Sequence, residues 1–174
     1  MRTPPMRPAD TDYAPHFAGY IGRVPEDDVL GALERQSSET QKLLASIDDA
    51  RAAFRYEPSK WSVKQVIGHV IDTERIMSYR ALAIARGETQ SLPGFDEKEY
   101  VQHAHFDDWS LGDLAEEYAL TRRANIVLLC NLPNDAWDRR GLANGNPITA
   151  RALAYVIVGH ERHHLNVLKE RYRL

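Results

Sequence analysis

The sequence predicts an all-α protein, an antiparallel four-helix bundle. Four stretches place apolar residues at helical spacing, turn signals separate these stretches, and no segment shows the alternation of a strand. The chain has 174 residues, 43% of them hydrophobic and 27% charged, which is the composition of one globular domain with one core. We therefore expect a bundle domain over residues 24–174, preceded by a flexible N-terminal arm over residues 1–23.

The first two helices are expected in the N-terminal half of the domain. The first runs from about Glu26 to Asp49. The second begins after Pro58, where Ser62 and Gln65 have the spacing of a capping box, in which the hydroxyl accepts from the third helical N–H and the glutamine reaches back. It ends at Gly87, a residue suited to the left-handed position after a helix.

The other two helices carry similar start signals. The third should begin at Ser110, with Asp113 in the position of a second Ser-x-x-acid cap, and run to about Asn131. The fourth begins near Pro147 or Thr149 and continues almost to the C-terminus.

The connections between helices two and three, and between helices three and four, are long. They span Glu88 to Trp109 and Leu132 to Asn146. Loops of this length are uncommon in a compact domain unless they cover something. They are either walls or lids for a site at one end of the bundle, or simple crossings of the bundle ends.

Charge and cysteine content exclude several classes of protein. The formal net charge is −3, and Lys and Arg are scattered among Asp and Glu, so a nucleic-acid partner is not expected. Apolar runs are too short to cross a membrane, and the N-terminus lacks the apolar segment of a signal peptide. The single cysteine, Cys130, follows an apolar run and is expected to be a small core residue. A cytoplasmic location follows from these features.

Three histidines are candidates for a metal site. His160 and His164 are four residues apart, so both imidazoles leave the fourth helix on one face, and apolar residues surround them at helical spacing. His69 lies on the inward face of the second helix. Three neutral imidazoles that converge in a core are most simply satisfied by one divalent transition-metal ion, with a fourth position open for water or substrate.

A glycine precedes a candidate ligand in each of these two helices. Gly68 comes before His69, and Gly159 before His160. Glycine inside a helix costs roughly 0.5–1 kcal/mol relative to alanine. We therefore expect a neighbouring helix or a ligand to approach closely at both positions.

The segment from His160 to His164 also reads as His-Glu-x-x-His, the helix of zinc proteases, in which Glu161 would be the general base. Only ten residues follow His164, and they contain no suitable third ligand, which argues against a protease. His163 is a supporting donor, a surface residue or a substitute ligand. His103 and His105 are expected to face solvent unless a lid brings either one to the site.

Two further polar residues lie on the second helix. Arg80 returns to nearly the same face as His69 about three turns later, where it either holds an anionic group of a substrate or forms a salt bridge at the helix end. Glu74 is turned away from His69 and is expected in a surface or inter-helix ion pair. His16 lies in the expected arm and is given no role.

Three segments carry a resemblance to a known family: WSVKQVIGHVIDTERIMSYRALAIARG, PGFDEKEY and ANGNPITARALAYVIVGHERHHLNVLKERY. Together they resemble the DinB superfamily, in particular its YfiT-like branch, over about residues 24–173. The resemblance implies a four-helix bundle that is often a homodimer. It also implies nickel, zinc or a similar ion bound by His69, His160 and His164, with iron, manganese or copper as alternatives.

The resemblance also implies a range of activities. Members of the superfamily include transferases and isomerases that use low-molecular-weight thiols such as bacillithiol, mycothiol or glutathione, so we expect a metal-dependent thiol transferase acting on a small molecule. One alternative is metal-assisted hydrolysis of a small ester or amide, in which Glu161 or His163 moves the proton. Another is a metal-binding stress protein without catalysis. Arg80 remains a third candidate for the active site.

Overall fold

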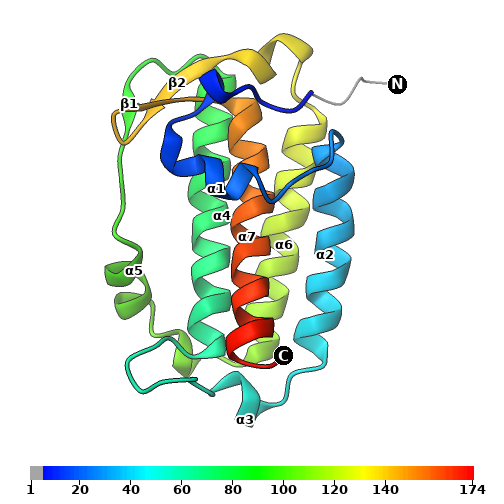
Figure 1. The fold of residues 1–174 in the computed structure, drawn as a ribbon, viewed down its shortest axis with the longest axis vertical. Coiled ribbons are helices and arrows are strands. Elements are labelled where there is room, and N and C mark those ends of the chain that lie inside the picture. The colour runs from blue at the N-terminus through cyan, green and yellow to red at the C-terminus, as the bar shows by residue number, and fades with distance from the viewer. Residues whose placement is uncertain (1–5) are drawn as a thin grey trace.

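The computed structural model describes residues 6–174 and confirms the expected four-helix bundle (Figure 1). Its long helices are α2 (Val29–Ala45), α4 (Val63–Ala85), α6 (Leu111–Cys130) and α7 (Ala150–Arg171). None of the helices in the described part of the chain is both long enough and apolar enough to cross a membrane.

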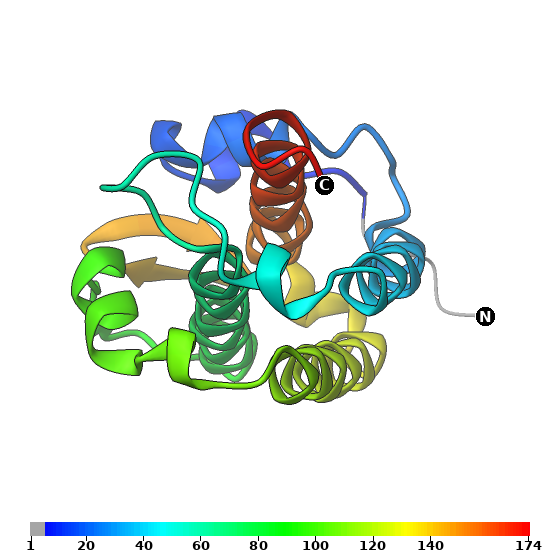
Figure 2. The same cartoon turned by 90° about the horizontal axis from the view of Figure 1, so that it is seen from below.

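The four helices form a square in which α4 lies beside α7 and α6, and α2 completes the ring (Figure 2). Helices α4 and α6 run in one direction, and α2 and α7 in the other (Figure 1). The antiparallel arrangement therefore holds for the pairs α4–α7 and α2–α6, whereas α4 and α6 are parallel neighbours. The largest interface joins α4 to α7, the two helices that carry the candidate metal ligands.

This order of helices explains the length of both connections. Because α6 begins at the opposite end of the bundle from the end of α4, the chain must return along α4, and it does so through β1 (Ser91–Leu92) and α5 (Glu97–Ala104) (Figure 1). The second connection crosses one end of the bundle diagonally and contains β2 (Arg140–Ala143) and β3 (Asn146–Thr149).

These strands correct the expectation that the chain has none. They form a small sheet in the order β1-β2-β3, with β1 parallel to β2 and β2 antiparallel to β3. Asn144 and Gly145, at φ 51° and 74°, make the tight turn between β2 and β3. Strands of two to four residues are too short to produce a readable alternation of polar and apolar residues.

Part of the N-terminal segment packs against the bundle, whereas a flexible arm over residues 1–23 was expected. Phe17 and Ile21 are buried, and α1 (Ala18–Ile21) lies on α7. Residues 1–5 lie outside the described part. The remaining short elements are α3 (Asp49–Ala52) and four 3₁₀ helices at Asp10–Asp12, Pro15–Phe17, Phe106–Asp108 and Asn134–Asp138.

The expected helix caps are present. Ser62 Oγ accepts from Gln65 N–H at 3.1 Å, and the side-chain oxygen Oε1 of Gln65 accepts from Ser62 N–H at 3.1 Å, so both sides of the capping box form. Ser110 caps α6, and Thr149 caps α7. These side chains satisfy N–H groups that have no partner within the helix, and they fix where each helix begins.

The middle of the bundle contains a buried cluster of charged groups. The Arg122 guanidinium donates to both carboxylate oxygens of Glu74, at 2.7 and 2.8 Å, and to Glu161. Asn125 donates to Glu74, and the Tyr118 hydroxyl donates to Glu161 at 2.8 Å. The inter-helix ion pair expected at Glu74 is therefore confirmed. The histidines were expected in this position, and they lie instead on the other side of α4 and α7.

Candidate metal centre

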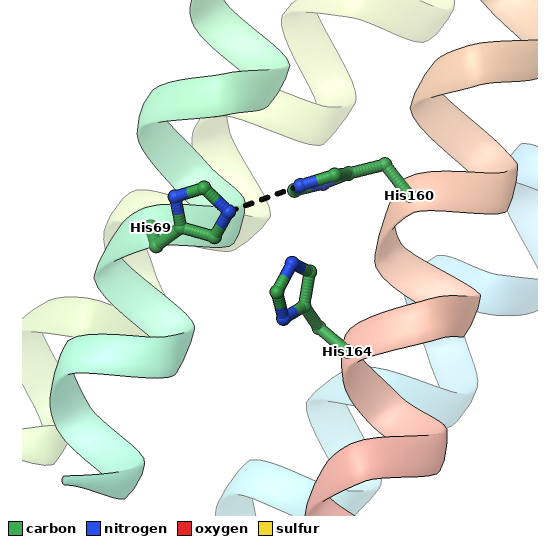
Figure 3. Close-up of side chains that lie close together, drawn as sticks. All are labelled: His69, His160 and His164. Atoms are coloured by element: carbon green, nitrogen blue, oxygen red, sulfur yellow. Dashed lines mark hydrogen bonds between the residues drawn. The ribbon is translucent and has the colours of Figure 1, made fainter. Parts of the chain in front are cut away.

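His69, His160 and His164 converge between α4 and α7 (Figure 3). Their candidate ligand nitrogens all lie within 4.8 Å of one another, and His69 Nε2 is 3.0 Å from His160 Nε2. Two ligands about 2.0–2.1 Å from a tetrahedral zinc ion lie roughly 3.4 Å apart. The 3.0 Å separation and the 4.8 Å limit lie on either side of this distance, so the three nitrogens are close enough together to hold one metal ion.

Burial keeps these three imidazoles neutral. It lowers the pKa of His69 to about 4 and that of His164 to about 3, and the pKa of His160 falls well below its ordinary value. Burial is the largest cause in each case, and repulsion among neighbouring histidines adds to it. A neutral imidazole offers the lone pair that a metal requires, so the cluster is ready for binding at neutral pH.

These shifts predict how the stability of the metal-free protein depends on pH. Below about pH 6.5 the unfolded chain takes up protons at these histidines that the folded chain does not. The free energy of unfolding should therefore be highest above pH 6.5 and fall as the pH drops towards 4. Urea denaturation in the presence of a chelator measures it. His69→Gln should flatten this dependence and exposed His103→Gln should not; an equal slope in both variants would contradict the assignment.

The two glycines beside the ligands are positions of close approach, as expected. A Cβ atom on Gly159 would collide with the backbone carbonyl of Tyr20 in α1, and one on Gly68 would collide with the ring of Phe106. Both collisions would be closer than real Cβ contacts. Each glycine thus lets a covering segment lie directly against a helix that carries the site.

Gly159→Ala is expected to displace α1 and to destabilise the protein by about 1–3 kcal/mol, the usual cost of overpacking, although alanine is the better helix former. Gly112→Ala is the matched control, because a Cβ there meets only Ser110 Oγ at an ordinary 3.6 Å. It should be neutral or stabilising in thermal unfolding. If both variants melt alike, the contact between α1 and α7 does not require glycine.

The structure shows that Glu161, one of the other candidate residues, does not face the three histidines. Glu161 is 1% exposed and bonded to Arg122 and Tyr118 in the middle of the bundle, so it points away from the three histidines. The expectation that it moves a proton at the metal is therefore wrong.

His163 is half-buried with its ring 4.9 Å from that of His164, whereas His103 is exposed. His105 is also exposed, so the expectation for this pair is confirmed.

Two cavities meet at the histidine cluster. The first, of about 380 Å³, is lined by His69 and His160 and extends along α4 to Arg80. The second, of about 830 Å³, is lined by His163 and His164. The first cavity has walls from both long connections and from the N-terminal segment; these wall residues are His16, Phe17, Tyr20, Gly94, Phe95, Asp96, Glu97, Lys98, Ala143 and Asn144. The connections therefore form walls of the first cavity.

Two of these wall residues, Glu97 and Tyr20, come close to the histidines and were missed in the sequence. Glu97 begins α5 and lines both cavities, with Oε2 3.9 Å from His69 Nε2. The Tyr20 ring lies 5.3 Å from that of His160, and burial raises the pKa of its hydroxyl. Glu97 belongs to the PGFDEKEY segment, and the family resemblance of this segment was a signal that could have identified it. Tyr20 precedes the first recognisable helical pattern and had none.

The sequence of the chain matches a known protein family. A profile of the DinB superfamily matches residues 32–168, most of the chain. The chain belongs to the DinB superfamily. Among solved structures, this DinB-superfamily chain is similar to YfiT from Bacillus subtilis, described as a probable metal-dependent hydrolase with an unusual four-helix bundle topology. The TM-score is 0.76 at 19% sequence identity, over 84% of this chain and 85% of YfiT, which shows a shared fold. No curated protein matches the chain.

Proposed function

We propose that the chain binds one divalent transition-metal ion, nickel or zinc, through His69, His160 and His164, and that it is a metal-dependent enzyme that uses a low-molecular-weight thiol. The observation that carries this proposal is the convergence of three neutral imidazoles beside open cavities. Three protein ligands with an open fourth position are typical of catalytic sites and not of closed structural ones.

A bound divalent ion would lower the pKa of a thiol or water that reaches it and so supply a nucleophile near neutral pH. The protein would then have to accept one proton. The Glu97 carboxylate, beside His69 and half exposed, is placed to take this proton from the nucleophile and release it to solvent.

Thiol transfer is supported by the two cavities. A transferase must bring a thiol and an electrophilic small molecule to one point, and the cavities approach the histidine cluster from different sides. Glu97 and Lys98 line both cavities, so they stand where the two substrates would meet.

Hydrolysis of a small ester or amide is the second candidate. Glu97 could serve as the general base for a water molecule, and the similar YfiT structure is described as a probable hydrolase. The two candidates differ in whether turnover needs a thiol.

The test uses protein purified without an affinity tag. Elemental analysis identifies the bound ion, and the cobalt-substituted protein is titrated with 2-mercaptoethanol. A sulfur-to-cobalt charge-transfer band, together with thiol-dependent turnover of 1-chloro-2,4-dinitrobenzene, is the expected result. Thiol-independent cleavage of 4-nitrophenyl acetate without such a band would favour the hydrolase. Metal binding with neither reaction would favour a non-catalytic metal-binding protein.

We also infer that the chain forms a homodimer through the parallel pair α4–α6. Tyr79 and Leu82 of α4 and Leu120 of α6 are exposed and line an apolar groove of about 390 Å³ between these helices. Exposed apolar patches of this kind favour association. Sedimentation velocity should give twice the chain mass, and a monomer at all concentrations would contradict the inference.

A further inference from the structure

The floor of the first cavity is one face of α4. His69, Thr73, Met77 and Arg80 line it at spacings of four, four and three residues, which keeps them on the same side of the helix. Their Cα atoms span about 16 Å along the helix axis at 1.5 Å per residue. The cavity therefore has the histidine cluster at one end and a cation at the other.

Arg80 at the far end of the cavity is a buried positive charge without a carboxylate partner. Its side chain is 4% exposed, yet within residues 6–174 no ion pair at 4.0 Å or less includes its guanidinium. Its Nη2 donates to the Pro93 carbonyl at 2.6 Å, and the guanidinium lies over the Phe95 ring at 5.8 Å. These contacts orient the group but do not neutralise it.

Arg122 differs from Arg80 because its charge is compensated by carboxylates. Arg122, the buried arginine in the middle of the bundle, has two glutamates around it, and these charges raise its pKa. The pKa of Arg80 is lowered, and burial is the cause. A buried charge is unfavourable unless an opposite charge compensates it, so the environment of Arg80 is incomplete without an anion.

The carboxylates that line the same cavity do not supply this anion. Asp96 Oδ1 caps α5 by accepting from the N–H groups of Lys98 and Glu99 at 2.8 and 3.1 Å. Glu97 lies at the other end of the cavity, beside His69. Neither carboxylate forms an ion pair with Arg80 at 4.0 Å or less, so an anionic ligand in the cavity would supply the missing partner.

A second unsatisfied group lies between the two ends of the cavity. The Thr73 side chain is 2% exposed, and its Oγ1 has no hydrogen-bond partner among residues 6–174. A helical threonine commonly bonds to the carbonyl four residues earlier, but Thr73 does not. A buried hydroxyl without a partner is costly, and a polar group of a ligand in the cavity would satisfy it.

We propose that the first cavity binds a linear organic acid whose carboxylate is held by Arg80 and whose reactive end lies at the three histidines. Thr73 hydrogen-bonds to a polar atom along its length. One guanidinium in a cavity of about 380 Å³ matches a single negative charge and favours a carboxylate over a phosphate dianion. Placement of the reactive end rests on the proposed function, whereas carboxylate binding does not.

The test measures binding of octanoate and 1-octanol to the metal-free protein by calorimetry. Octanoate should bind at least tenfold more tightly than octanol, because a charge-assisted hydrogen bond is lost in the alcohol. Arg80→Met should weaken octanoate binding about tenfold to a hundredfold and leave octanol unchanged. Arg86→Met, which removes an exposed arginine at the C-cap of the same helix, should change neither.

Equal binding of octanoate and octanol to the wild-type protein would overturn the proposal, and so would equal losses in the Arg80 and Arg86 variants. If Arg80→Met does not fold, the comparison of octanoate with octanol on the wild-type protein still tests the proposal. Arg80→Lys, which keeps the charge, should then retain the preference for the acid, and its loss of that preference would count against a purely ionic role for Arg80.

A second measurement separates this proposal from the proposed function. The cobalt-substituted protein is titrated with 8-mercaptooctanoate and 8-mercaptooctanol, and the charge-transfer band reports sulfur at the histidine cluster. A preference for the acid supports both proposals together. Octanoate binding without cobalt binding would leave Arg80 as an anion site and reject the metal enzyme. Binding of cobalt and of both thiols without preference for the acid would support the metal site and reject Arg80 as an anion site.

Discussion

His160→Gln is expected to abolish high-affinity binding of a divalent ion and to leave the fold nearly unchanged. His160 is one of three nitrogen donors, and its Nε2 faces His69 Nε2 at 3.0 Å, so its loss leaves two ligands on opposite helices. Loss of an outer-shell partner alone costs about 10–100-fold in metal affinity, and loss of a ligand should exceed this. Glutamine is similar in size and polarity, so the metal-free variant should melt within a few degrees of the wild type.

Elemental analysis and titration with a metal indicator measure the loss of binding, and circular dichroism gives the melting temperature. His103→Gln is the control, because His103 is exposed and outside both cavities. A His160 variant that still carries one equivalent of metal would contradict the site. One that unfolds when metal-free would indicate that the buried imidazole mainly supports the structure.

Helical spacing was enough to predict which histidines come together. The four-residue interval between His160 and His164 fixes their common face, and apolar neighbours indicate that this face is buried. The glycines were equally informative, because Gly68 and Gly159 are unfavourable inside helices unless a neighbour lies close, and Phe106 and Tyr20 are these neighbours. Glycine inside a helix has a cost in free energy, and for this reason the two positions predicted a close neighbour.

The walls of the site could be predicted only in part. Periodicity cannot identify a helix of four residues such as α1, so the packing of Tyr20 on His160 depends on tertiary contacts that the sequence does not display. The β2–β3 hairpin did have a signal, since Asn144-Gly145 is a strong turn pair. The parallel α4–α6 pair, which forces the long return past Arg80, follows from how four faces pack together and not from any one helix.

The charged cluster in the bundle shows how one motif can be read in two ways. Glu161 fits the His-Glu-x-x-His pattern of a general base, but its burial beside Arg122 gives it a structural role. A signal for this was present, because Tyr118, Arg122 and Ile126 follow one another at intervals of four and place a cation on an apolar stripe. A charged residue on such a stripe requires partners of opposite charge from other helices, and Glu74 and Glu161 are these partners.

Arg122→Met is therefore expected to cause the largest loss of stability, about 3–5 kcal/mol, because two buried carboxylates lose their cation. For a chain of this size the loss corresponds to a fall of roughly 6–20 °C in melting temperature. Arg123→Met is the matched control, since the neighbouring arginine is exposed and should contribute within about 0.5 kcal/mol. Urea denaturation of both variants measures the difference.

The cause of this loss can be separated from a simple packing defect. If uncompensated charge is responsible, adding Glu74→Gln and Glu161→Gln to Arg122→Met should recover part of the stability, because neutral amides are less costly to bury than carboxylates. If packing is responsible, the triple variant should be no more stable than Arg122→Met. Recovery would mean that Glu161 serves the fold through its charge. The proton chemistry beside the three histidines would then have to rest on groups that face them, of which Glu97 is the nearest carboxylate.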